Sequence, residues 1–138
     1  MYGETAGLVV RELVKSKLIP PYHDEQLRRV AQELRGLDEL AGDRRSPPDA
    51  LLYTRAIQHN KRCILAYLLE RVHRLEELWW IAGSARTVSR ELSSCLSSNE
   101  VGFLNRYDAI VGDYISSTDV DLNLVNDLIL VLRIEVCS

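Results

Sequence analysis

The chain has 138 residues, which suffice for one domain with a single hydrophobic core and are too few for two. Its 20 acidic and 17 basic side chains give a net charge of -3, which argues against binding nucleic acid or an anionic membrane through phosphate neutralisation alone. No run of about 18 apolar residues is present, and the first residues lack the basic segment of a signal peptide. We therefore expect a soluble, intracellular protein without a membrane partner.

The cysteines are an odd number at wide spacing, namely Cys63, Cys95 and Cys137. They cannot all pair in a closed disulfide framework, and free thiols are typical of a reducing compartment. His59 and Cys63 stand four residues apart and could both touch one metal ion. Because zinc takes about four ligands and no second pair is nearby, we expect no metal and no cofactor.

Two helices are predicted in the first third of the chain. The first spans residues 4–16, ends before a pair of prolines, and presents an apolar side made of Leu8, Val9 and Leu13. Asp24 is expected to cap the second helix. Its apolar residues recur at spacings of three and four, which is typical of antiparallel helix packing: Leu27, Val30, Leu34, Leu37 and Ala41. A polar, proline-containing loop over residues 42–49 then permits a reversal of direction.

The longest predicted element is a helix over residues 49–81, which contains no Gly or Pro. Its apolar residues gather on one broad face, as expected for a central helix that faces the core: Ile57, Ile64, Leu65, Tyr67, Leu68, Val72, Leu75, Leu78 and Trp79. Arg71 points into this apolar arc. We therefore expect a carboxylate or backbone carbonyl groups of a packed neighbour to hold its charge.

The opposite, polar face of this helix carries Arg62 and has two apolar exceptions, Leu69 and Trp80. These two residues suggest a second burial surface, against another segment or another protein. Adjacent residues on a helix point about 100° apart. We therefore expect Trp79 to lie in the core and Trp80 in an interface, without sharing one pocket.

Beyond the long helix the pattern weakens, and a second helical segment is predicted over residues 85–96. Ser97 and Glu100 have the form of a capping box. This box would open a final helix whose apolar side repeats as Leu104, Tyr107, Val111 and Tyr114. Residues 116–127 are polar and read as a linker. Residues 128–136, rich in β-branched side chains, predict a strand that has no second strand in this chain to pair with.

No catalytic pattern stands out: the chain lacks an evident nucleophile beside a base and a glycine-rich phosphate loop. We therefore expect a protein that is not an enzyme. An alternative is a small helical nucleic-acid-binding protein that uses a basic strip on the long helix, made of Arg55, Lys61, Arg62, Arg71 and Arg74. A third hypothesis is a metal-dependent helical enzyme that uses His59 and Cys63.

Residues 60–80, NKRCILAYLLERVHRLEELWW, resemble the signature helix of the Psf-one-type subunit of the GINS complex. The matching positions are Lys61, Arg62, Cys63, Ala66, Tyr67, Leu68, Glu70, Arg71, Leu75 and Trp80. A later block matches through Phe103, Asn105, Tyr107 and Tyr114. Residues 132–136 look like the first strand of that family's small carboxy-terminal β-domain. The resemblance covers most of the chain, and the first 50 residues match only in helical pattern.

The expected fold is all-α, an antiparallel helical bundle around one long central helix, followed by a linker and a single strand-like segment. The expected domains are a bundle over residues 1–115, a linker over 116–127 and a first β-strand over 128–138. The resemblance implies a non-catalytic structural subunit of the nuclear GINS heterotetramer. The implied partners are other GINS subunits, the MCM helicase with its loading partner, and the leading-strand DNA polymerase, with DNA contact indirect or weak at most. The candidate interface residues are Arg62, Leu69, Arg71, Trp80, Tyr107, Tyr114, Leu132 and Ile134.

Overall fold

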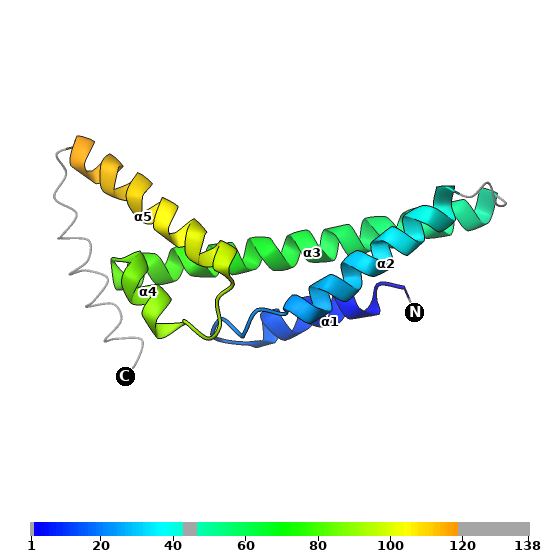
Figure 1. The fold of residues 1–138 in the computed structure, drawn as a ribbon, viewed down its shortest axis with the longest axis horizontal. Coiled ribbons are helices and arrows are strands. Elements are labelled where there is room, and N and C mark those ends of the chain that lie inside the picture. The colour runs from blue at the N-terminus through cyan, green and yellow to red at the C-terminus, as the bar shows by residue number, and fades with distance from the viewer. Residues whose placement is uncertain (1, 43–46, 119–138) are drawn as a thin grey trace. The chain divides into compact units, whose positions relative to one another are not determined.

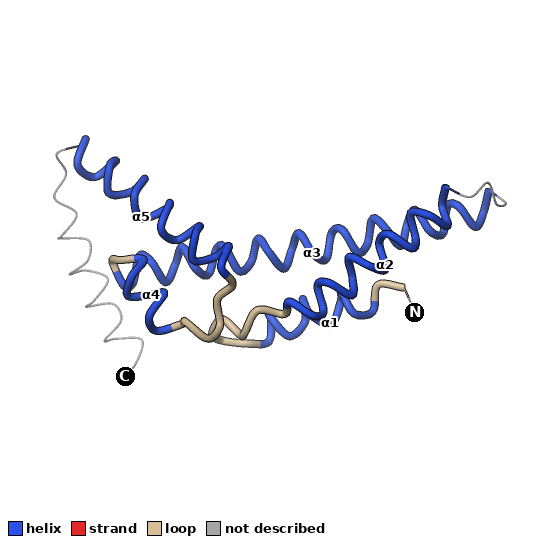
Figure 2. Tube along the Cα trace, viewed as in Figure 1, coloured by secondary structure: helices blue, strands red, loops and turns tan. Residues whose placement is uncertain are grey.

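The computed structural model describes residues 2–42 and 47–118. These residues form helices α1 (Glu4–Lys15), α2 (Asp24–Gly42), α3 (Pro47–Ala82), α4 (Ala85–Glu91) and α5 (Ser98–Thr118), and no strand occurs within the described ranges (Figure 2). The all-α prediction is confirmed. The strand predicted over residues 128–138, with Leu132 and Ile134, lies outside the described residues. The chain divides into two compact units, residues 1–71 and 72–138, and α3 contributes residues to both.

In the first unit, α2 and the amino-terminal part of α3 run side by side in opposite directions (Figure 1). The middle of α2 meets the middle of this part of α3: Asn60 donates to Glu33, and Leu34 and Asp38 line a hollow together with Ile57 and Lys61. Tyr67 packs on Val9 and Leu13 of α1, and together these three buried residues form a core cluster. The expected antiparallel helix packing is therefore present in this unit.

Three details of the first two helices were predicted with mixed success. The helix α1 begins where expected and ends one residue earlier, at Lys15, but its third buried position is Ala6, whereas Leu8 is 49% exposed. Asp24 is the first residue of α2 rather than a cap preceding it, and it pairs with Arg28 one turn later. Leu8 is exposed because Ala6, Val9 and Leu13 share the buried face at helical spacing, and Leu8 lies outside that face.

The helix α3 extends one to two residues beyond the predicted range at each end. It ends because Gly83 adopts a left-handed conformation, with φ 69°, and its N–H donates to the Trp79 carbonyl at 2.7 Å. Its buried stripe is narrower than the apolar arc in the sequence and consists of Asn60, Tyr67, Arg71, Leu75 and Trp79. The prediction that Leu65 and Leu68 face the core is wrong, since they are 66% and 37% exposed.

In the second unit, α4 is shorter than predicted. Ser84 caps its start by accepting a hydrogen bond from the Arg86 N–H, and Leu92 follows its last residue as the carboxy-terminal cap. Residues 92–96 therefore do not continue the helix, although a helix over 85–96 was expected. Two serines, at positions 93 and 94, follow the cap. Because serine is a weak helix former, these residues have little tendency to extend α4. Ala85 and Val88 face the core of this unit with Leu104 of α5.

The capping box predicted for α5 is confirmed. The Ser97 N–H donates to the Glu100 carboxylate at 2.8 Å, and the Glu100 N–H donates to the Ser97 hydroxyl at 3.3 Å. The helix continues through Thr118, so the first three residues of the predicted 116–127 linker belong to it. The rest of that segment lies outside the described residues.

Candidate interaction surfaces

Arg71 is fully buried, and its charge is held inside the first unit by the segment that joins α1 to α2. Its guanidinium Nη1 donates to the Pro20 carbonyl at 2.7 Å, and its guanidinium carbon Cζ lies 5.3 Å and 5.6 Å from the ring centres of Tyr22 and Tyr67. The expectation that carbonyl groups hold this charge is confirmed. Because a buried cation needs a satisfied donor set, Arg71 fixes the α1–α2 connection onto α3.

The Tyr67 hydroxyl extends this network toward α1. It accepts a hydrogen bond from the His23 backbone N–H at 3.2 Å and lies 3.2 Å from His23 Nδ1. The other ring nitrogen, Nε2, lies 2.9 Å from the Glu12 carboxylate. His23 therefore joins all three helices of the unit, and Arg71 belongs to an internal network rather than to an exposed strip.

A second polar contact that the sequence did not reveal lies between α1, α2 and α3. Glu33 Oε1 accepts from the Gly3 N–H at 2.8 Å and from Asn60 Nδ2 at 3.1 Å. Asn60 is fully buried. Gly3 has φ 83°, and a β-carbon there would stand 2.6 Å from the His59 ring, so only glycine fits. Asparagine and glycine carry no hydrophobic signal, which is why periodicity missed them.

In the second unit, Asp108 ties three elements together. Its Oδ1 accepts from Trp79 Nε1 at 2.7 Å and from the Ala85 N–H at 3.1 Å. The end of α3 and the start of α4 are thereby bound to the middle of α5. Trp79 is only 6% exposed, which confirms its expected place in the core. Asp108 carries no sequence signal for this role, because one acidic residue on an amphipathic helix looks like a solvated one.

Trp80 is 38% exposed, and its Nε1 donates to the Tyr107 hydroxyl at 3.0 Å. The two tryptophan rings meet edge to face at 5.1 Å, and the Trp79 ring also lies 5.3 Å from that of Tyr107. The prediction that they share no pocket is therefore wrong. The side chains leave the helix in different directions, but both indoles are long enough to reach Tyr107, on which Phe103 stacks.

Exposed apolar side chains form a compact group on α3 in the first unit. Leu65, Leu68 and Leu69 stand at helical spacings of three and four and are 66%, 37% and 57% exposed. Arg62, one turn earlier, is also exposed. In the second unit, Ile110 and Tyr114 occupy successive turns of α5 and are 67% and 65% exposed. Large apolar groups at such spacings are typical of helix faces that bind other helices.

The structure gives little support to the two alternative sites, the metal site at His59 and Cys63 and the basic strip on α3. Cys63 Sγ lies 3.6 Å from His59 Nε2, and within residues 2–42 and 47–118 no group of three potential metal ligands occurs. Within the basic strip, Arg71 is buried, whereas Arg55, Lys61 and Arg62 are exposed. Those three residues still face solvent, but the buried arginine cannot neutralise a phosphate.

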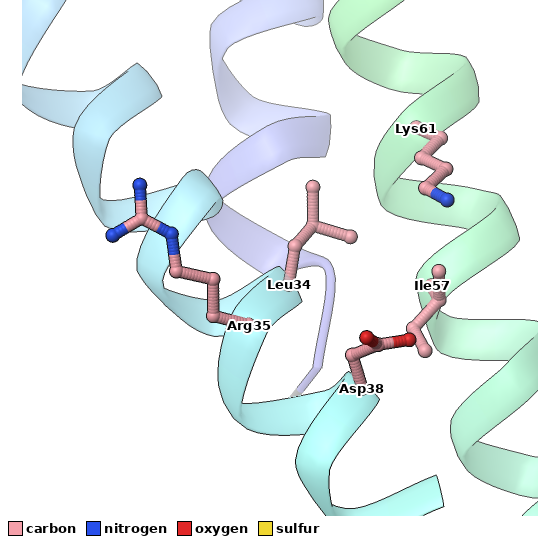
Figure 3. A pocket seen from close by; sticks show the side chains of 5 residues that line it. All are labelled: Leu34, Arg35, Asp38, Ile57 and Lys61. Carbon is pink, nitrogen blue, oxygen red and sulfur yellow. The ribbon is translucent and has the colours of Figure 1, made fainter. Parts of the chain in front are cut away.

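A small hollow of about 210 Å³ lies between α2 and α3 in the first unit (Figure 3). Leu34 and Ile57 supply its apolar lining, and Arg35, Asp38 and Lys61 supply its charges. The Asp38 carboxylate is directed toward α3, whereas Arg35 extends away from it (Figure 3). Pockets that enclose small molecules are usually larger than about 300 Å³, so this hollow is a poor candidate for a substrate site.

Comparison with known families identifies the bundle. Residues 17–119 match the family model of Sld5, described as "GINS complex protein helical bundle domain". The chain belongs to the GINS helical-bundle family. The matched range begins in the segment after α1, includes α2 to α4, and ends one residue beyond α5. The GINS resemblance inferred from the residues is thereby confirmed.

Relatives in this GINS family align with nearly the whole chain. A protein of Dictyostelium discoideum named "Probable DNA replication complex GINS protein PSF1" is 30% identical over 135 residues, covering 90% of this chain and 70% of that protein. The Bos taurus "DNA replication complex GINS protein PSF1" is 29% identical over 142 residues, covering 93% and 71%. The Gibberella zeae protein of the same name is 29% identical over 154 residues, covering 88% and 73%.

None of the helices in the described part of this GINS-family chain has the length and apolar character needed to cross a membrane. The described polar contacts instead join the helices of each unit to one another. Among the described residues, the exposed large apolar side chains lie on α3, on α5, on part of α1, and at Tyr2 and Leu18 to either side of α1.

Proposed function

We propose that this chain is the PSF1-type subunit of a GINS complex and acts in DNA replication as a structural, non-catalytic component. The observation that carries the proposal is the match of residues 17–119 to the GINS helical bundle, together with relatives named PSF1 that align over about nine tenths of the chain. The names of these relatives identify the complex and the process.

The physical support is the distribution of polar and apolar side chains. Arg71, Glu33 and Asp108 each use their charge to join helices within one unit. The exposed Leu65, Leu68 and Leu69 are instead free to gain stability from burial against a partner subunit. Polar contacts inside each unit together with exposed apolar groups are suited to a structural subunit that binds its partners through surface contacts.

The finer parts of the proposal follow from the GINS resemblance. In them the chain joins the other GINS subunits in a nuclear heterotetramer, which binds the MCM helicase with its loading partner and couples it to the leading-strand polymerase. The net charge of -3 and the burial of Arg71 support a subunit whose contact with DNA is indirect or weak at most.

Co-expression with the other GINS subunits tests the proposal. The expected result is a stoichiometric complex measured by light scattering after size exclusion, while the chain alone self-associates through its exposed leucines. Leu69→Asp should abolish the complex without loss of helical circular dichroism, and Gln58→Asp, at another exposed position of α3, should leave it intact. A chain that stays monomeric at tens of micromolar and ignores the other subunits would refute the proposal.

A further inference from the structure

The outer side of α1 carries an unusual mixture of charge and apolar surface. Over residues 8–18, Leu8, Val14 and Leu18 are 49%, 66% and 76% exposed. Three exposed cations lie among them, namely Arg11, Lys15 and Lys17. We call these six residues the α1 surface. The opposite side of the helix, with Ala6, Val9 and Leu13, is buried in the first unit, so this surface is not needed for the core.

The charges of the α1 surface are not balanced by nearby carboxylates of the described residues. Glu12, the acidic residue in this stretch, is already paired with His23 Nε2 at 2.9 Å. Across the described residues, no carboxylate lies within ion-pair distance of Arg11, Lys15 or Lys17. In a protein of net charge -3, three unbalanced cations within seven residues form a local basic surface.

The helix dipole explains only part of this arrangement. A cation in the last turn, such as Lys15, is favourable because the carboxy-terminal end of a helix is partially negative. That effect accounts neither for the exposed Val14 and Leu18 nor for Lys17, which follows the helix. Along α1 at helical spacing, Arg11 and Lys15 project between Leu8 on one side and Val14 on the other. The face therefore has a cationic centre with an aliphatic rim on each side.

We propose that the α1 surface binds an acidic amphipathic segment of a partner protein, with carboxylates on its centre line and aliphatic side chains along both edges. Such a segment places carboxylates against Arg11 and Lys15 and buries its edges against Leu8 and Val14. Nucleic acid fits less well, since a phosphate backbone gains nothing from exposed aliphatic groups. An anionic membrane fits less well too, because an interfacial helix needs one continuous apolar face.

This inference goes beyond the proposed function. The helix α1 precedes the residues that match the GINS family model, which begin at Lys17, and the surface is defined by its own charges and exposure. It places one more partner on the chain, of a chemistry different from the apolar group on α3.

The test uses the full chain within its reconstituted complex, and the full chain alone as a second sample. The probe is a fluorescein-labelled helical peptide with Glu at positions i, i+4 and i+7 and Leu on both edges of that face, followed by fluorescence anisotropy. The triple variant Arg11→Glu, Lys15→Glu, Lys17→Glu should raise the Kd at least about tenfold. A matched triple reversal at three other exposed arginines, Arg35→Glu, Arg55→Glu and Arg86→Glu, should leave the Kd unchanged.

A second peptide, with every Leu replaced by Ser, separates pure charge attraction from the proposed mode and should bind about tenfold more weakly. Three results would overturn the inference: no measurable binding of the first peptide, equal losses in the two triple variants, or competition by a short DNA duplex or by anionic vesicles. Loss of complex assembly in the α1 triple variant would also overturn it, since the surface would then be an internal subunit contact. Failure of the unmodified chain to assemble would instead refute only the proposed function.

Discussion

Removing the buried guanidinium of Arg71 should be among the most destabilising single changes in the first unit. Arg71→Ala takes away one charge-assisted hydrogen bond to Pro20, a contribution of about 1.5 to 3 kcal/mol, and two cation–π contacts of about 0.5 to 1 kcal/mol each. The expected loss of unfolding free energy is about 3 to 5 kcal/mol. For a chain of this length that corresponds to a fall in Tm of about 10 to 20 °C.

The measurement is thermal unfolding followed by circular dichroism, in the reconstituted complex and in the chain alone. Arg62→Ala is the matched control, because Arg62 lies on the same helix but is exposed, and its loss should cost less than about 0.5 kcal/mol. Arg71→Lys should fall between the two, since an ammonium keeps the charge but lacks the planar fork. Equal Tm values for the Arg71→Ala and Arg62→Ala variants would refute the assignment of Arg71 as the residue that holds the α1–α2 connection.

The remaining predictions concern packing, backbone and caps. Trp79→Ala should abolish folding of the chain, at a cost of about 3 to 5 kcal/mol. Trp80→Ala should keep the helical circular-dichroism signal and weaken binding of a partner subunit by about 2 kcal/mol. Lost folding with unchanged affinity in the Trp80→Ala variant would contradict this prediction. Gly3→Ala should lower the free energy of unfolding in urea by about 2 kcal/mol. Gly36→Ala, where a β-carbon meets nothing within 4 Å, should raise it by about 0.5 to 1 kcal/mol. Shifts of the same sign in the two variants would count against the steric reasoning. Glu100→Ala should cost about 1 kcal/mol in thermal unfolding through loss of the capping box, with most of it restored by Glu100→Gln.

The order and nature of the helices could be predicted because they depend on local signals. The glycine after α3 and the Ser97–Glu100 box act within a few residues, so the sequence alone indicates them. The interior of each unit depends on side chains that are distant in sequence. Glu33 meets Asn60 across 27 positions, and no periodicity marks either residue as a core position.

The width of the buried stripe on α3 shows the same limit. Hydrophobic spacing identifies the apolar positions that could be buried, and Leu65 and Leu68 satisfy it as well as Leu75 does. Which part of that arc is covered depends on where α1 and α2 pack. Arg71 was located correctly because a charge inside an apolar arc requires a partner wherever the helix packs. The partner itself, the Pro20 carbonyl, carries no sequence signal at all.

The paired tryptophans give this chain an intrinsic optical probe. One indole is shielded and bound to Asp108, and the other is 38% exposed and bound to the Tyr107 hydroxyl. They are the two tryptophans of the whole sequence, so all indole emission comes from these two environments. A partner without tryptophan that covers Trp80 should shift the emission to shorter wavelength, whereas unfolding exposes both indoles and shifts it to longer wavelength. Docking and denaturation can therefore be told apart in one cuvette, with no label attached.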